Sequence, residues 1–246
     1  MIKYSIVMPY FDRLIQLTRT LVSFAHHYGA RDDYEIIIVE DAKNTDGLRE
    51  MLVTFMQLPI HILKMRTGQD NYTPAKQYNE GARVAKGTYL VLTNPECFHT
   101  NDILDNCDQL FKQPFDNMYV VCACRHVTNC TMNLEDFWSL RYRTGKWFQH
   151  SQERNNLLNF CSIMPAQFYQ EVGGFDEEFG PGYAFADDDF RDRVKLLASA
   201  VIPADSMLVL HQEHTKFHSY VNATKYRARH ERNRILYERR RSARAK

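Results

Sequence analysis

The amino-acid sequence predicts an α/β fold with a doubly wound, mostly parallel sheet and helices on both faces. Within residues 3–93, apolar strand-like segments alternate with segments of helical periodicity, which is the pattern of such sheets. The segment at 34–40 (YEIIIVE) is nearly continuous in Ile and Val, as expected of a strand that is covered on both faces. A length of 246 residues, 44% of them apolar, suits one such domain with a small appendage.

The elements of the first half follow from local signals. Pro9 ends the first strand, and Asp46 is a favourable N-cap for the second helix. Pro74 stands at the first position of the third helix, with Thr73 before it as a cap. The expected strands are 3–9, 34–40, 60–64 and 88–93, and the expected helices are 14–28, 46–57 and 73–86.

The second half is less regular. We expect helices at 103–112 and about 188–198, and strands at 118–124, 158–164 and 206–210. Residues 130–157 hold both tryptophans among many charged groups, and a loop rich in glycine and acidic residues covers 173–189.

The formal net charge of +1 hides an asymmetry. Residues 225–246 hold ten basic and two acidic side chains, so this tail carries a local charge of +8 and the remainder carries −7. A basic tail of this kind indicates an anionic partner. Two interpretations stay open: a helix that touches anionic lipid at a membrane surface, and a solvated helix.

Several classes of protein are disfavoured. No segment reaches the roughly 18 apolar residues that a membrane span needs, and the N-terminus shows no signal-peptide pattern. The six cysteines include no C-x-x-C pair, so zinc-site spacing is absent, and we expect reduced thiols in a cytoplasmic protein. The G-x-G-x-x-G, P-loop and G-x-S-x-G motifs are also absent.

Ligands of such sheets bind beyond the carboxyl ends of the strands, so the polar residues at those ends are candidates for a site. They are Tyr10 to Arg13, Asp41 to Asn44, and Asn94 to Glu96. Asn94-Pro95-Glu96 directly follows an apolar strand. It is either a turn, which Asn-Pro favours, or a site whose oxygen ligands hold Mg²⁺ or Mn²⁺.

Acidic residues gather before the helix expected at about 188–198. Six carboxylates lie within residues 176–189, and three of them are adjacent at 187–189. Their mutual repulsion raises at least one pKa, which suits a general base; alternatively, the acids complement the N-terminus of the helix. The segment from His211 to His214, after an apolar run, offers imidazole to the same kind of metal ion or has a structural role.

Together these motifs resemble family 2 glycosyltransferases and their relatives of the GT-A fold, including the β-1,4-galactosyltransferase group. The resemblance covers about residues 3–215. It rests on SIVMPYFDR at 5–13, VED at 39–41, AKQYNEG at 75–81, NPE at 94–96 in the place of D-x-D, GGFDE at 173–177 and ADDDF at 186–190. Asp12 replaces the usual Asn, Asn94 replaces the first acid of D-x-D, and Ala186 replaces a Glu.

The resemblance implies a GT-A domain at 1–220, with a nucleotide-sugar-binding half at 1–98 and a smaller acceptor and catalytic half at 99–220, followed by a basic helical tail at 221–246. It implies a UDP-sugar donor bound by Pro9, Tyr10, Phe11, Arg13, Glu40, Asp41, Lys76 and Asn94. Glu96 and His211 are the expected ligands of Mn²⁺ or Mg²⁺, which would offset charge on the leaving diphosphate.

The implied reaction moves a sugar, with inversion, to a hydroxyl of a glycan, glycolipid or similar acceptor. Asp187 is the expected general base, with Asp188 beside it as a second catalytic residue. The residues expected to contact the acceptor are Trp147, Asp176, Tyr183 and Asp189. Packing in the core is the alternative for each tryptophan.

Two other functions stay open. A GT-A domain that binds nucleotide sugar or glycan without transferring it is favoured by Asn94 and Ala186. A nucleic-acid-binding protein is favoured only by the tail and opposed by the acidic body, so no nucleic-acid partner is expected.

Overall fold

The computed structural model describes residues 1–41, 46–65, 74–112, 117–133, 136, 138–215 and 223–244. Its strands are β1 (Tyr4–Tyr10), β2 (Tyr34–Asp41), β3 (Ile60–Met65), β4 (Tyr89–Thr93), β5 (Cys97–His99), β6 (Met118–Met132), β7 (Leu140–Gln149), β8 (Cys161–Pro165) and β9 (Ala200–Gln212). Its helices are α1 (Leu14–Tyr28), α2 (Leu48–Leu52), α3 (Pro74–Val84), α4 (Ile103–Leu110), α5 (Ala166–Val172), α6 (Ala186–Leu197) and α7 (Ala223–Arg244), with short 3₁₀ segments η1 (Val53–Phe55) and η2 (Glu177–Phe179). The predicted α/β fold is confirmed.

The strands form one sheet. Within the described residues its order is β3-β2-β1-β4-β8-β6-β9-β5, and β7 pairs with β6. β1 runs parallel to both β2 and β4, and β3 runs parallel to β2. β8 then pairs antiparallel with β4 and with β6, so the second half of the sheet is mixed. The carboxyl ends of β1, β2 and β4 therefore meet at one edge, where ligands of such sheets bind.

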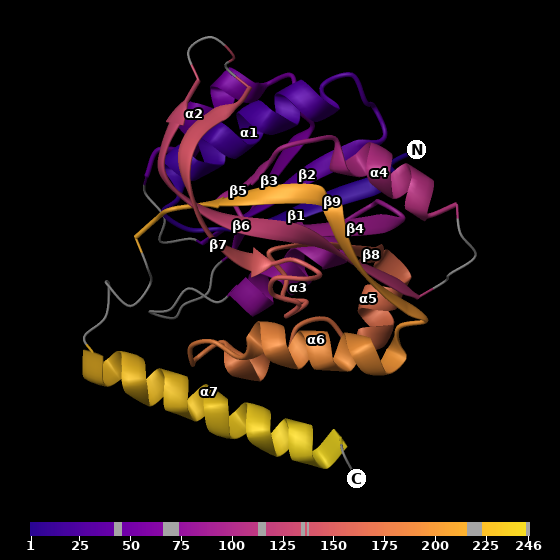
Figure 1. Cartoon of the computed structure of the whole chain (residues 1–246), viewed down its shortest axis with the longest axis vertical. Coiled ribbons are helices and arrows are strands. Elements are labelled where there is room, and N and C mark those ends of the chain that lie inside the picture. Colours follow the sequence, from indigo (N-terminus) through magenta and orange to yellow (C-terminus); the bar gives the residue numbers. More distant parts are fainter. Residues whose placement is uncertain are drawn as a thin grey trace.

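Helices cover both faces of the sheet (Figure 1). Leu17 of α1 packs in one core with Ile6, whereas Tyr78 of α3 and Phe190 of α6 pack in the other with Val7. Ile6 and Val7 serve opposite cores because successive side chains of a strand point to opposite faces. α7 lies outside α6 as a further layer (Figure 1). None of the described helices combines the length and the apolar character needed to cross a bilayer, and the cytoplasmic location stays a prediction.

Some local predictions were wrong or incomplete. Asp46 does not cap α2: the helix begins after Gly47 (φ 81°), and Asp46 instead accepts a hydrogen bond from the Tyr10 hydroxyl. The prediction missed β7, which has no apolar alternation because its middle residues are exposed on the arm that it forms with β6. It also missed α5, whose seven residues are too few for a helical period to stand out. Thr73 lies outside the described residues.

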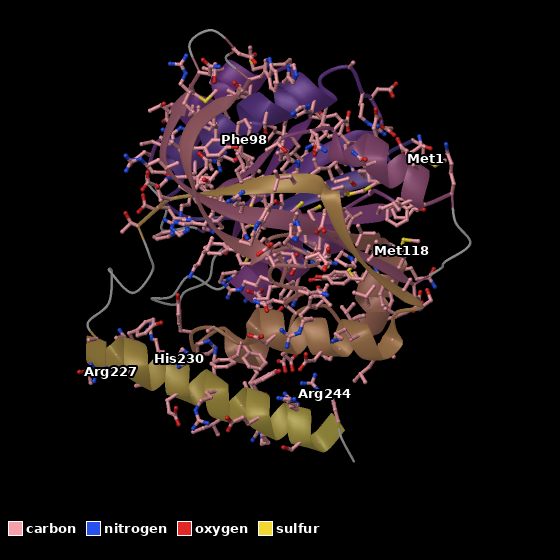
Figure 2. All side chains as sticks on the ribbon, viewed as in Figure 1. Met1, Phe98, Met118, Arg227, His230 and Arg244 are labelled. Atoms are coloured by element: carbon pink, nitrogen blue, oxygen red, sulfur yellow. The ribbon has the colours of Figure 1, made fainter. Side chains whose placement is uncertain are left out.

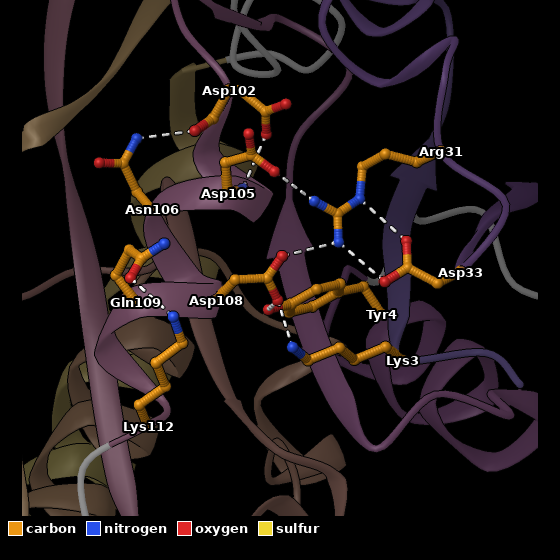
Figure 3. A network of polar contacts seen from close by, with 10 residues as sticks. All are labelled: Lys3, Tyr4, Arg31, Asp33, Asp102, Asp105, Asn106, Asp108, Gln109 and Lys112. Atoms are coloured by element: carbon orange, nitrogen blue, oxygen red, sulfur yellow. Dashed lines mark hydrogen bonds and ion pairs between the residues drawn. The ribbon is translucent and has the colours of Figure 1, made fainter.

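Arg31 joins the amino-terminal edge of the sheet to α4 (Figure 3). Its guanidinium group lies 2.6–2.9 Å from the carboxylates of Asp33, Asp105 and Asp108. Lys3 also pairs with Asp108, and the Tyr4 hydroxyl donates a hydrogen bond of 2.7 Å to the same carboxylate. Burial alone would raise the pKa of Asp108, but the hydrogen bonds from Lys3, Tyr4 and Arg31 outweigh it and hold that pKa below its usual value.

We expect Arg31→Met to lower the free energy of unfolding by about 1–3 kcal/mol, because three carboxylates lose their shared cation. Urea denaturation measures the change. Arg83→Met is the matched control, since Arg83 pairs only with Glu80 within the described residues and its side chain is 66% exposed. The control is expected to change stability by less than about 0.5 kcal/mol. Equal losses in the two variants would contradict a special role for Arg31.

Candidate functional site

A pocket of about 390 Å³ opens at the carboxyl edge of the parallel strands. One wall comes from the turn after β1, the start of α3 and the end of β4; the other comes from the segment between η2 and α6 and from α7. The lining residues are Arg13, Pro74, Ala75, Tyr78, Asn94, Glu96, Asn159, Phe179, Gly180, Gly182, Tyr183, Ala184, Ala186, Asp187, His214 and Asn233.

The pocket brings together five of the residues that the sequence singled out, from segments far apart in the chain. They are Arg13, Asn94, Glu96, Tyr183 and Asp187. Arg13 is fixed by hydrogen bonds from its guanidinium group to the carbonyl oxygens of Asp12 (2.7 Å) and Thr215 (3.0 Å). Asn94 accepts a hydrogen bond of 3.0 Å from the Tyr78 hydroxyl through its Oδ1, which leaves its amide N–H₂ group to donate.

Hydrogen bonds next to this pocket link two of the sequence motifs, AKQYNEG and GGFDE. Asn79 of α3 accepts hydrogen bonds from the backbone N–H of Phe175 (2.9 Å) and from the Tyr169 hydroxyl (2.7 Å), and its Nδ2 donates to the Phe175 carbonyl (2.9 Å). Gly174 has φ 61° and leaves no room for a Cβ beside Asn79. Gly81 lets α3 approach β1 closely, because a Cβ there would overlap Val7. The AKQYNEG and GGFDE motifs therefore set the position of α3 against the turn after α5.

Three side chains form a candidate metal centre. β5 pairs antiparallel with β9, with Cys97 opposite His211, and this register brings Glu96 beside the end of β9. Glu96 Oε1 lies 3.6 Å from His211 Nε2 and 3.5 Å from His214 Nε2. These separations are long for hydrogen bonds, but two ligands of one small divalent cation lie roughly 3–3.5 Å apart. The potential ligand atoms of all three residues lie within 4.8 Å of one another.

The protonation of His211 suits this role. The pKa of His211 is lowered to about 4, chiefly by burial; Glu96 opposes this change, and His214 and His126 add to it. The imidazole is therefore neutral near pH 7 and keeps a lone pair for a cation. Its Nδ1 atom is buried and has no hydrogen-bond partner within the described residues. Phe148 and Phe160 contact the ring with centroids 5.0 and 5.8 Å away, so aromatic packing holds its orientation.

Asp187 stands in the first turn of α6 and is reached by solvent through the pocket. Asp187 is exposed as a residue, and the partial loss of hydration of its carboxyl group among the atoms of the pocket wall raises its pKa to about 7. The negative charge of Asp188 adds to the rise, and Arg191 opposes it. A carboxyl group with this pKa exists in both protonation states near neutral pH, as a general base requires.

The helical phase separates the three adjacent acids. Asp188 pairs with Arg191 over 2.9 Å. Asp189 is buried, 1% exposed, and pairs with Arg193 (2.8 Å) and with Arg244 of α7 (2.7 Å). Asp189 therefore belongs to an ion-pair cluster and is not among the residues that line the pocket, and its expected contact with an acceptor stays a prediction.

Other predicted contacts are also placed elsewhere. Pro9 and Tyr10 are buried in β1, and Glu40 is 3% exposed and pairs with Arg49 over 3.2 Å. Burial of these side chains leaves them no direct access to a donor. Phe11 and Lys76 are half-buried and are not among the residues that line the pocket. The side chain of Asp41 lies outside the described residues.

Two predicted acceptor residues have protein partners outside the pocket. Asp176 caps η2 by accepting from the Glu178 N–H over 3.0 Å, and it pairs with Arg240 over 3.1 Å. The guanidinium group of Arg125 lies over the ring of Trp147, with its Cζ atom 4.8 Å from the ring centroid. Both contacts favour structural roles for these side chains.

Four residues that line the pocket were not predicted from the sequence to have a role. His214 stood in the motif after the last strand, but only His211 was assigned as a ligand there. Tyr78 is the residue after Gln77 in AKQYNEG, and its place in a helical pattern gives no sign that its hydroxyl holds Asn94. Asn159 and Asn233 also line the pocket, and neither belongs to a recognised motif.

We expect Asp187→Asn to raise the midpoint of thermal unfolding at pH 8 and to leave it nearly unchanged at pH 4. The pKa of Asp187 rises from 3.8 to about 7 on folding. Protonation of Asp187 therefore stabilises the folded state fully below pH 4, and this contribution is lost as the pH rises through 7. The Asn variant has no ionisable group at this position, so it does not lose stability in this way. Calorimetry at both pH values measures this, with exposed Asp32→Asn as the control. A variant no more stable than wild type at pH 8 would refute the raised pKa.

Comparisons with known proteins agree with this architecture. The chain resembles residues 1–349 of S. aureus TarS in complex with UDP-GlcNAc, with 15% identity and a TM-score of 0.68, over 90% of this chain and 61% of that one. It also resembles the mannosyltransferase PcManGT from Pyrobaculum calidifontis in complex with GDP-Man and Mn²⁺, with 15% identity and a TM-score of 0.60, over 89% of this chain and 59% of that one. At this identity the likeness shows the fold, which is the GT-A fold of glycosyltransferases.

The chain spans about three fifths of the length of these two solved chains, and 37% of a longer TarS structure. No curated protein sequence matches it. The resemblance to the β-1,4-galactosyltransferase group stays a prediction. The family model "Glycosyl transferase family 2" matches residues 5–173, which is well over half of the chain. The chain therefore belongs to glycosyl transferase family 2.

Proposed function

We propose that the chain transfers a sugar from a UDP-sugar to a hydroxyl group of a glycan, glycolipid or similar acceptor, with inversion at the anomeric carbon. The observation that carries this proposal is one pocket that holds both Asp187, with a pKa of about 7, and Glu96 of the candidate metal centre. Family membership and neighbours in complex with UDP-GlcNAc and GDP-Man support a nucleotide-sugar donor. UDP is preferred because TarS is also seen in complex with UDP.

The donor atoms of Glu96, His211 and His214 fit a divalent cation. Two imidazoles and one carboxylate suit a transition-metal ion such as Mn²⁺ better than Mg²⁺, which prefers oxygen ligands. A cation bound there supplies a Lewis acid that offsets negative charge on the leaving diphosphate. The proposal therefore places Mn²⁺, with Mg²⁺ as the weaker alternative, at these three residues.

The other donor contacts come from the pocket wall below the strands. Arg13 is anchored by two backbone carbonyls, and its remaining N–H groups are available for a diphosphate. Asn94 offers its amide N–H₂ group to a ribose hydroxyl or a phosphate oxygen, while Tyr78 occupies its Oδ1. In this proposal the amide of Asn94 contacts the donor by hydrogen bonds, as a replacement for the first acid of the D-x-D motif.

Asp187 acts as the general base. Its carboxylate takes the proton of the acceptor hydroxyl while the hydroxyl oxygen forms a bond to the anomeric carbon and the bond from that carbon to the diphosphate breaks. Attack from the face opposite the leaving group inverts the configuration, and no covalent intermediate with the protein forms. Asp188, held by Arg191, acts by raising the pKa of Asp187. Tyr183, which lines the pocket, is the proposed stacking surface for the acceptor sugar.

We expect wild type with Mn²⁺ to release UDP from one member of a panel of UDP-sugars. Asp187→Asn should lower kcat by about 10²–10⁴-fold, the usual contribution of a general base. In wild type, kcat/KM should rise with pH up to about 7 and then level off, because only the ionised carboxylate accepts a proton; the variant should lack this rise. A luminescent UDP assay measures both, with Asp32→Asn as the control.

Clear UDP binding without release from any sugar, with or without simple sugar acceptors, would contradict the transfer proposal. It would favour the alternative of a GT-A domain that binds its ligand without transferring it. Ala186, which lines the pocket where the family has a Glu, is the observation in favour of that alternative.

We expect Mn²⁺ to raise the thermal unfolding midpoint of wild type, because a ligand that binds the folded state stabilises it. Glu96→Ala and His214→Ala should each remove most of this increase, and Mg²⁺ should produce a smaller one. His61→Ala is the control, since the side chain of His61 is 59% exposed and remote from the three ligands in the sheet order. A wild-type response to Mn²⁺ in both ligand variants would exclude this site.

A further inference from the structure

The basic tail is docked on the catalytic half of the same chain. α7 lies along α6, with Arg227 and Arg244 near its opposite ends (Figures 1 and 2). Arg240 pairs with Asp176 (3.1 Å) and Glu178 (2.6 Å), and Arg244 pairs with the buried Asp189. The Asp192 carboxylate accepts a hydrogen bond of 2.7 Å from Tyr237. Part of the charge asymmetry of the sequence is therefore neutralised within the protein.

One uncharged side chain of α7 reaches the pocket. Asn233 is 1% exposed and is itself a lining residue. Its Nδ2 donates to the carbonyl of Phe179 over 3.0 Å and to the carbonyl of Ala184 over 2.8 Å. These two carbonyls bracket the loop at 179–184, which forms the wall of the pocket next to Asp187. Both N–H donors of the amide are thus used to hold the two ends of that loop.

The loop is shaped to receive this side chain. A Cβ atom at Gly182 would overlap the Asn233 amide, whose atoms are its three nearest neighbours. The backbone N–H of Tyr183 donates to the Arg229 carbonyl over 3.3 Å. The loop therefore contacts α7 through backbone and side chain, and only glycine fits at 182 while Asn233 is present.

The end of the loop is held in an unfavourable conformation. Ala184 and Phe185 have φ angles of 63° and 67°, in the left-handed region that residues with a Cβ rarely adopt. Phe185 stacks on Tyr237 of α7, with ring centroids 5.6 Å apart, and contacts His230 at 5.1 Å. Such a conformation persists only where surrounding contacts impose it. Asp187 follows two residues later, so its position depends on these contacts.

We propose that Asn233 is a positioning residue for Asp187: from α7 it fixes the loop at 179–184 and thereby the distance from the carboxylate to the acceptor hydroxyl. This inference rests on the proposed function. A displacement of about 1 Å in a reacting group can lower the rate by about 10²-fold. We therefore expect Asn233→Ala to lower kcat by about 10–100-fold. Affinity for UDP should be unchanged, because the residues proposed to bind it belong to the opposite wall.

The matched test is a double-variant cycle with Gly182→Ala. Alone, Gly182→Ala should lower kcat, because its methyl group displaces Asn233. In the Asn233→Ala background the amide is absent, so adding Gly182→Ala should have almost no further effect on kcat. Strong non-additivity of this kind reports direct contact between the two sites. Ile235→Ala, at a side chain that is 55% exposed on the same helix, is the control for general effects on α7.

Amide hydrogen exchange supplies a readout that does not depend on activity. Exchange at 179–187 should quicken in Asn233→Ala and stay at the wild-type rate in Ile235→Ala, while β1 and β4 stay protected in both. Wild-type kcat and wild-type exchange in Asn233→Ala, or additive effects of the two substitutions, would overturn the inference. If wild type itself releases no UDP, the proposed function fails, and exchange at 179–187 alone supports or overturns the contact.

Discussion

The two walls of the pocket are joined by one side chain, Asn79. Its amide group meets the backbone N–H and carbonyl of Phe175 and the hydroxyl of Tyr169, so a helix of the parallel half is bound to the turn that leads toward η2 and α6. Phe175 in turn stacks between Tyr78 and Phe190, with ring centroids 4.9 and 4.2 Å away. This polar contact and this aromatic stack hold the parallel half of the sheet, near Glu96, against the segment that leads to Asp187. Glu96 and Asp187 therefore face one cavity.

Ion pairs also organise the acidic residues near the pocket. The acidic side chains before and within α6 would repel one another in isolation. Arginines of α7 neutralise Asp176, Glu178 and Asp189, and Arg191 of α6 neutralises Asp188. Within the part of the chain that the structure describes, no arginine of α7 pairs with Asp187, and the negative charge of Asp188 lies beside it. The result is one carboxyl group with a raised pKa among several with ion-pair partners, which is the separation of roles that acid–base chemistry needs.

The sequence predicted the parallel half well because its signals are local: apolar runs of strand length, helical periodicity and the glycines at close approaches. It also named Glu96, which lies between β4 and β5, His211, which lies near the end of β9, and Asp187, which lies at the start of α6. The family resemblance assigned a role to each of the three adjacent aspartates, but it could not show that Asp189 is held in an ion-pair cluster, which depends on the phase of α6 and on α7. Nor could it identify Asn233, whose partners are backbone carbonyls about fifty residues away in the sequence.

The position of Asn233 in the chain has a consequence for the order of folding. Synthesis proceeds from the amino terminus, and early-made segments can fold before later ones emerge. The sheet and both cores are complete by Gln212, where β9 ends, yet the wall of the pocket next to Asp187 is completed only by Asn233 of α7. A nascent chain without α7 would thus hold the parallel strands in place while the loop before Asp187 stays unsupported. Under the proposed function, binding of the donor and competence for transfer would be acquired at different times.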